Sequence, residues 1–93
     1  MKNISKISQA AAMLKALGNP KRLEIVYVLR EGERKVGELE KKVKISQSAL
    51  SQHLAVLREA KIVVTRRKAQ SIYYSVANNN CLLLMQLLDK LYA

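Results

Sequence analysis

The residues best suited to chemistry lie in segment 46–57, where amide and hydroxyl side chains gather on one side of an expected helix. At about 100° per residue, Leu50, Leu54 and Leu57 form an apolar stripe, and the polar side chains lie opposite it. Glutamine amides can pair bidentately with adenine, and serines are short enough to let a helix approach a base edge or a phosphate. For each serine, simple helix solubility is the competing explanation. The candidate base-reading residues are Gln47, Ser48, Ser51 and Gln52.

His53 flanks the same apolar stripe and is the single histidine of the chain. A metal site needs several ligands, and neither a second histidine nor a nearby cysteine accompanies it. We therefore expect His53 to contact a phosphate or to form a hydrogen bond where the helix meets the core.

A cationic run follows the polar helix, at Arg66, Arg67 and Lys68. Such side chains suit phosphates or a narrow minor groove, where the negative potential favours arginine. Three lysines before the helix would support the backbone contacts that position it. The alternative is a solvated hairpin tip. These lysines are Lys41, Lys42 and Lys44.

The elements that position these residues are short. Val36, Leu39 and Val43 predict a helix, and Ser46 caps the polar helix that follows. The β-branched and aromatic runs 62–64 and 72–76 predict two strands, with 66–71 as the turn between them. This order predicts a winged helix-turn-helix, a fold that reads duplex DNA.

Helices are also expected on both sides of this segment. Apolar residues at helical spacing predict a helix over 4–17, and Asn19-Pro20 starts a second one that runs to Gly32. The last helix, 79–92, is apolar nearly all round, so it must be buried on more than one side. A second copy related by a two-fold axis is the simplest way to bury this helix. The alternative is a monomer that leaves an apolar surface exposed. The expected interface residues are Ile7, Leu14, Leu84, Leu88 and Leu91.

The fold class expected is mainly α with a small β-hairpin, in the order four helices, two strands and one helix. The 93 residues, 49% of them apolar, suit a single domain over 1–93 with a modest core. Segment 34–68 carries ten Lys/Arg against three Glu, a net of +7 out of +10 for the chain. A solvated basic surface or an acidic protein partner would also explain this charge, but its place on the polar helix favours phosphates.

Other functional classes find little support. Cys81 is the one cysteine, so no internal disulfide can form. The N-terminus lacks the apolar run of a signal peptide, and 82–88 is too short to span a bilayer, so we expect a soluble cytoplasmic protein without membrane contact. No nucleophile–base pair or phosphate-binding glycine loop is evident, so we expect neither an enzyme nor a cofactor.

The chain resembles the ArsR/SmtB family of small bacterial transcriptional regulators over almost its full length, and within it the redox-associated branch of haemolysin-activator and biofilm-repressor proteins. The resemblance implies a homodimer that binds an imperfect inverted repeat, as a repressor or an anti-repressor. It also implies DNA contacts at the positions of Gln47, Ser48, Ser51, Gln52 and His53. The motifs that carry it are Asn19–Leu23, Val36–Leu39, Ser46–Leu54, Leu57–Val63 and Gln70–Tyr74.

The sensor sites of that family are missing from this sequence. Segment 36–40 has no thiol, and 79–93 has no histidine or glutamate and only Asp89. The positions matching the redox branch's two cysteines are Tyr27 and Ala93. We therefore expect no bound metal, and we expect Cys81 to be a small buried hydrophobe rather than a sensor. The competing functional class is a nucleoid-associated protein that coats DNA with little specificity.

Overall fold

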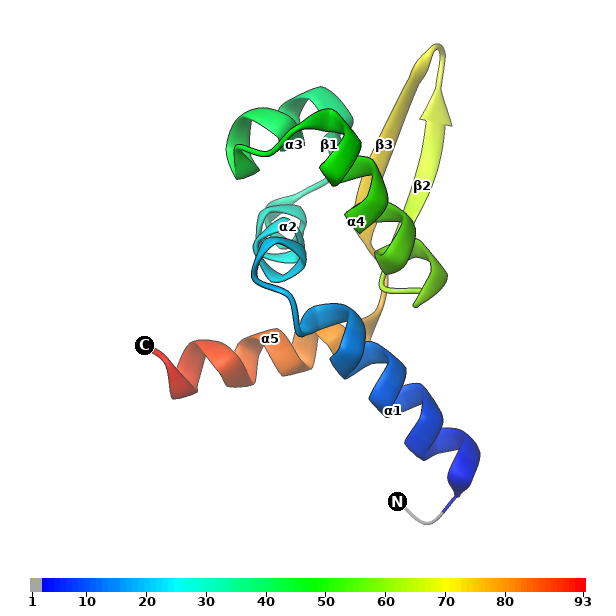
Figure 1. The fold of residues 1–93 in the computed structure, drawn as a ribbon, viewed down its shortest axis with the longest axis vertical. Helices are drawn as coiled ribbons and strands as arrows, with labels where there is room; N and C mark the ends of the chain where they lie inside the picture. The colour runs from blue at the N-terminus through cyan, green and yellow to red at the C-terminus, as the bar shows by residue number, and fades with distance from the viewer. Residues whose placement is uncertain (1–2) are drawn as a thin grey trace.

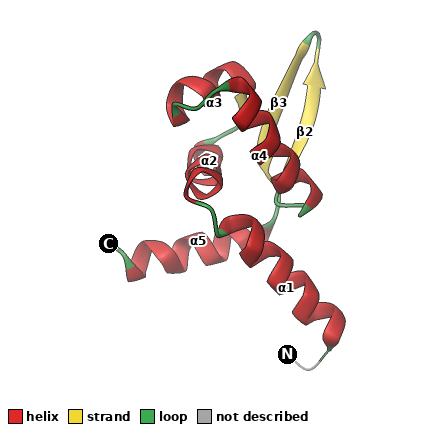
Figure 2. Ribbon diagram, viewed as in Figure 1, coloured by secondary structure: helices red, strands yellow, loops and turns green. Residues whose placement is uncertain are grey.

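The computed structural model describes residues 3–93, which form five helices and a three-stranded antiparallel sheet (Figures 1 and 2). The elements are α1 (Ile4–Leu17), α2 (Pro20–Glu31), β1 (Arg34–Lys35), α3 (Val36–Val43), α4 (Gln47–Glu59), β2 (Val63–Lys68), β3 (Ser71–Val76) and α5 (Asn79–Leu91). The predicted winged helix-turn-helix is confirmed, with one strand more than expected.

The helix starts follow from capping side chains. The Asn19 side-chain oxygen accepts from the backbone N–H groups of Lys21 and Arg22 at 2.9 and 3.1 Å, and Pro20 takes the first helical position. At the start of α4, Ser46 Oγ accepts from the Ala49 N–H at 3.2 Å. The predicted caps Asn19 and Ser46 are therefore confirmed.

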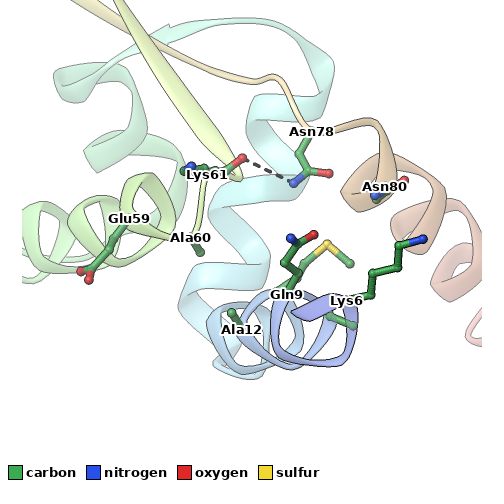
Figure 3. A pocket seen from close by; sticks show the side chains of 10 residues that line it. Lys6, Gln9, Ala12, Glu59, Ala60, Lys61, Asn78 and Asn80 are labelled. Carbon is green, nitrogen blue, oxygen red and sulfur yellow. Dashed lines mark hydrogen bonds between the residues drawn. The ribbon is translucent and has the colours of Figure 1, made fainter. Parts of the chain in front are cut away.

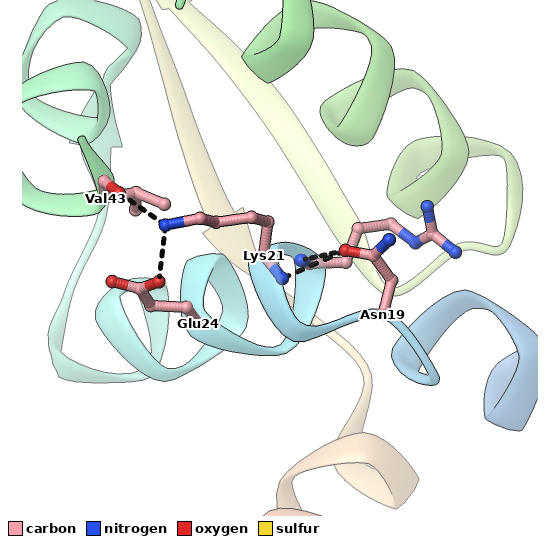
Figure 4. Close-up of polar contacts among 5 residues, drawn as sticks. Asn19, Lys21, Glu24 and Val43 are labelled. Carbon is pink, nitrogen blue, oxygen red and sulfur yellow. Dashed lines mark hydrogen bonds and ion pairs between the residues drawn. The ribbon is translucent and has the colours of Figure 1, made fainter. Parts of the chain in front are cut away.

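The turn between α3 and α4 is fixed from outside by Lys21. Its ammonium donates to the Val43 carbonyl at 3.2 Å and pairs with Glu24 at 3.5 Å (Figure 4). Lys44, which ends α3, adopts a left-handed conformation with φ of 59°. A cation at a helix C-terminus satisfies the free carbonyls there, so Lys21 helps to set where α4 begins.

The sheet has the order β1-β3-β2, and β2 and β3 form the wing hairpin. Lys68 pairs with Ser71, so the turn consists of Ala69 and Gln70 alone, with Ala69 at a φ of 57°. The predicted turn 66–71 is therefore wrong: the cationic run belongs to β2, because an exposed hairpin can pair polar residues as readily as apolar ones. Strand β1 pairs Arg34 and Lys35 with β3 and was not predicted.

The core lies between the helices and the base of the sheet. Leu50, Leu54 and Leu57 of α4 are buried, as the stripe predicted, against Ile25 and Val26 of α2. Cys81 and Met85 bring the first half of α5 into the same cluster. The polar face of α4 is thus left outward.

The two end helices leave the body on the side away from the wing tip (Figure 1). Of the expected interface residues, Ile7, Leu14 and Leu91 are exposed, whereas Leu84 packs against the core and Leu88 is half-buried. The outward apolar residues of α5 are Leu83, Leu87 and Leu91. No helix within residues 3–93 has the length and apolar character to cross a membrane.

Candidate nucleic-acid interface

The outward face of α4 carries the amides and hydroxyls that the sequence singled out. All four side chains are exposed, and the leucines behind them anchor the helix in the core. A helix held in this way offers donors and acceptors on a rigid support, which is what readout in a major groove requires. The four are Gln47, Ser48, Ser51 and Gln52.

His53 occupies the boundary between this face and the core. Its Nδ1 lies 3.4 Å from Nη1 of Arg22, whose Nε donates to the Ala16 carbonyl at 2.5 Å. Burial, and next the charge of Arg22, lower the pKa of the imidazole. The structure thus brings His53 to α2 and the end of α1, which is the boundary contact anticipated as one of its two roles.

The wing brings its cations close to the hairpin turn. Arg67 and Lys68 are exposed on the last two positions of β2. Arg67 lies on the sheet face that also carries Val63 and Val76, because alternate residues of a strand share a face. These two side chains therefore lie on the projecting end of the hairpin, past the level where β1 pairs with β3.

Arg66 has different surroundings. Its Nε and Nη2 donate to the two carboxylate oxygens of Glu33 at 2.8 and 2.5 Å, and its guanidinium lies 4.9 Å from the ring centroid of Tyr73. The hydrogen bond from Arg66 lowers the pKa of Glu33. Sequence reasoning missed Glu33 and Tyr73, because nothing in the sequence indicated that the segment before 36 joins the sheet.

The supporting lysines lie at the other end of the interface. Lys41 and Lys42 are exposed in the last turn of α3, and Lys44 is exposed in the turn that leads to α4. Figure 1 shows α3 beside the N-terminal end of α4, with the wing on the other side. Cations therefore flank the polar face from two directions.

Within residues 3–93 the possible metal ligands are not clustered, and the one thiol is buried. No group of three or more His, Cys, Asp or Glu side chains is close enough there to hold a metal ion. Cys81 is fully buried, and burial raises the pKa of its thiol. Tyr27, which by the resemblance matches a cysteine position of the redox-associated branch, lies against the guanidinium of Arg30, which pairs with Asp89 of α5 at 2.7 Å.

A cavity of about 770 Å³ lies among α1, the end of α4 and the start of α5 (Figure 3). Asn78 Nδ2 donates to the Lys61 carbonyl at 3.4 Å across its rim. Among the described residues, its other polar lining groups are Lys6, Gln9, Glu59 and Asn80.

Comparisons with known proteins agree with this geometry. A family model described as a bacterial regulatory protein of the arsR family matches residues 19–65. The transcriptional activator HlyU of Vibrio cholerae is 42% identical over 85 residues, which cover 91% of this chain and 79% of that protein. The solved structure of reduced HlyU has a TM-score of 0.88 at 40% identity, and the match covers 100% of this chain and 99% of that one.

Two further proteins are similar. The biofilm growth-associated repressor of Agrobacterium fabrum is 46% identical over 86 residues, 92% of this chain and 71% of that protein. The homodimeric winged helix-turn-helix DNA-binding domain of Mb0332 from Mycobacterium bovis has a TM-score of 0.87 at 28% identity, over 95% of this chain and 82% of that one. The fold, the exposed polar helix and these matches lead to one conclusion: the chain belongs to the arsR family of bacterial regulatory proteins.

Proposed function

We propose that this regulator binds an inverted-repeat operator in duplex DNA as a homodimer and controls transcription in the cytoplasm. The observation that carries the proposal is the outward polar face of α4, held by buried leucines and flanked by the cations of α3 and the wing. Amides and hydroxyls supply base discrimination, and the cations supply the salt-dependent attraction to phosphates.

Within this proposal Gln47 and Gln52 read base edges, and Ser48 and Ser51 let the helix approach and bind a base or a phosphate. Arg67 and Lys68 contact the backbone or the minor groove beside the half-site. His53 takes a positioning role through Arg22 rather than a direct phosphate contact.

The dimer is proposed to form through α1 and α5. Ile7 and Leu14 on α1, with Leu83, Leu87 and Leu91 on α5, leave apolar surface that a second copy would cover. Two copies related by a two-fold axis present two α4 helices, and such a pair matches an inverted repeat. The homodimeric description of the Mb0332 domain supports this arrangement.

The direction of regulation follows from what lies at the operator. One relative is named an activator and another a repressor. A DNA-binding domain of this size can do either by occupancy alone: it represses where it blocks polymerase, and it acts as an anti-repressor where it displaces another protein. We propose these two outcomes, and no catalytic one.

Selection of bound duplexes from a random DNA pool tests the proposal. We expect enrichment of two inverted half-sites whose centres lie about 10–10.5 base pairs, or a multiple of that spacing, apart. Enrichment of no sequence, with binding that depends only on salt, would instead support the low-specificity DNA-coating class.

A further inference from the structure

Part of the wing hairpin lacks the support of a third strand. A two-stranded hairpin is marginally stable by itself, and in Figure 1 the tip of the β2–β3 hairpin projects past the helices. The third strand supports only part of its length, because β1 pairs with Tyr73 and Tyr74 and no further. From Ile72 and Arg67 onward, toward the turn, the hairpin projects without a third strand.

Arg66 sits at the last supported position. It pairs across the sheet with Tyr73, which pairs in turn with Lys35 of β1. The strand order β1-β3-β2 places β3 between Arg66 and Glu33, the residue before β1. The guanidinium therefore crosses the middle strand, over the Tyr73 ring at 4.9 Å, to form its two hydrogen bonds with Glu33.

The hydrogen bonds to Glu33 occupy the paired Nε and Nη2 donors of Arg66. A bidentate carboxylate occupies the same fork of N–H groups that would bind a phosphate. The ammonium of Lys35 lies 5.7 Å from the centroid of the same tyrosine ring, so cations from both outer strands are held against β3. We call Glu33, Arg66 and Tyr73 the wing anchor.

We propose that Arg66 is a positioning residue that fixes the angle of the wing relative to α4, and that Arg67 and Lys68 make the wing's DNA contacts. The inference rests on the proposed function and changes the role expected for Arg66 from its sequence. The wing anchor locks the hairpin at the point where β1 stops supporting it, so the two cations beyond it reach the DNA from a defined direction.

The competing account makes Arg66 a phosphate ligand that Glu33 masks in the free protein. The two accounts predict opposite signs for Glu33→Gln. If the ion pair positions the wing, removing the carboxylate weakens operator binding. If the carboxylate masks a DNA contact, removing it strengthens operator binding.

The experiment measures operator affinity against salt for Glu33→Gln, Arg66→Gln and the charge swap Glu33→Arg with Arg66→Glu. We expect each single variant to weaken binding about three- to tenfold and the swap to recover most of the loss. The salt slope of Arg66→Gln should stay as in the wild type, whereas Arg67→Gln should be shallower by about one unit. Glu59→Gln and Arg58→Gln, which make the same charge changes at the end of α4, are the matched controls.

Two results would contradict the positioning role of Arg66. One is tighter operator binding by Glu33→Gln than by Glu59→Gln, and the other is a charge swap that binds the operator more weakly than both single variants. Hydrogen exchange of the β2 and β3 amides in the free protein gives a readout that needs no DNA, and both single variants should speed it. Unchanged exchange would count against the wing anchor alone. A wild type that does not prefer any operator would count against the proposed function alone.

Discussion

Neighbouring side chains on α4 have different surroundings, and we therefore propose different roles for them. Gln52 faces outward, while His53, the next residue, lies beside Arg22 at the core boundary. The sequence placed Gln52 opposite the apolar stripe and His53 beside it, and identified the boundary role of His53 as one of two options. It could not choose between them, because Arg22 is 31 positions away and only the packing of α2 on α4 brings it close.

The depressed pKa of His53 makes a prediction about stability. The folded state favours the neutral imidazole, so this contribution to the free energy of unfolding is complete above the ordinary histidine pKa of about 6.5 and is lost as the pH falls through the folded value. The lowered pKa values of Glu33 and Asp89 act in a more acid window, below about pH 4.3. Between about pH 7.5 and about pH 5, the free energy of unfolding measured in urea should therefore fall more steeply for the wild type than for His53→Gln. Parallel curves would show that His53 is not desolvated in the folded protein.

Cys81 gives a second prediction at this scale. Its thiol is buried and its pKa is raised, so little reactive thiolate is present. We expect stoichiometric zinc and mild oxidant each to leave operator affinity unchanged within about threefold, below roughly 0.7 kcal/mol of coupling. Titrations of the wild type and Cys81→Ser with each agent check this. A tenfold loss with zinc would reveal an overlooked ligand set, and oxidant-induced release that vanishes in Cys81→Ser would identify a redox switch.

At the level of elements, the helices could be predicted closely because their ends carry local signals. Asn19, Pro20, Gly32 and Ser46 lie where capping chemistry requires them. Strand β1 could not be predicted, since two charged residues carry no alternating pattern and their partners lie about 40 positions away. The hairpin turn was misplaced for the same reason: only the register with β3 shows that 66–68 are strand.

The cap of α4 makes a prediction about stability at this scale. Ser46→Ala removes the acceptor for the Ala49 N–H and should lower the free energy of unfolding by about 0.5–2 kcal/mol. Ser51→Ala, in the exposed interior of the same helix, should change it little, since alanine favours helices. Urea unfolding of the two variants decides, and equal effects would mean that the cap does not hold the helix start.

For the whole molecule, the wing and α4 lie toward one side and α1 and α5 toward the other (Figure 1). The sequence predicted an apolar last helix and assigned Leu84, Leu88 and Leu91 to its interface, whereas the exposed leucines are Leu83, Leu87 and Leu91. Leu84 and Leu88 turn toward the body, and Leu83 and Leu87 do not. The difference of one helical position depends on the rotation of α5 about its own axis, which is set by Cys81 and Met85 facing the core and which composition alone does not fix.

Leu87→Glu tests the proposed dimer. Leu87 is 50% exposed in the single chain, so the variant should fold, yet a charge buried in an apolar interface costs several kcal/mol and should give a monomer. Leu84→Glu should instead unfold the chain, because Leu84 packs against the core. Gln86→Glu, exposed on the same helix, is the matched control and should remain a dimer. Sedimentation measures the outcome, and a monomeric wild type at micromolar concentration would contradict the interface.

We expect α4 to read the base sequence and the wing to supply attraction to the DNA backbone. The most direct measurement is the ratio of affinities for the selected operator and for random duplex DNA at fixed salt, compared between the wild type and Gln52→Ala. We expect Gln52→Ala to lose about 1–3 kcal/mol on the operator and almost nothing on random DNA, so that the ratio falls. Arg67→Gln should weaken both and leave the ratio nearly unchanged. An equal loss on both DNAs for Gln52→Ala would contradict base reading by α4.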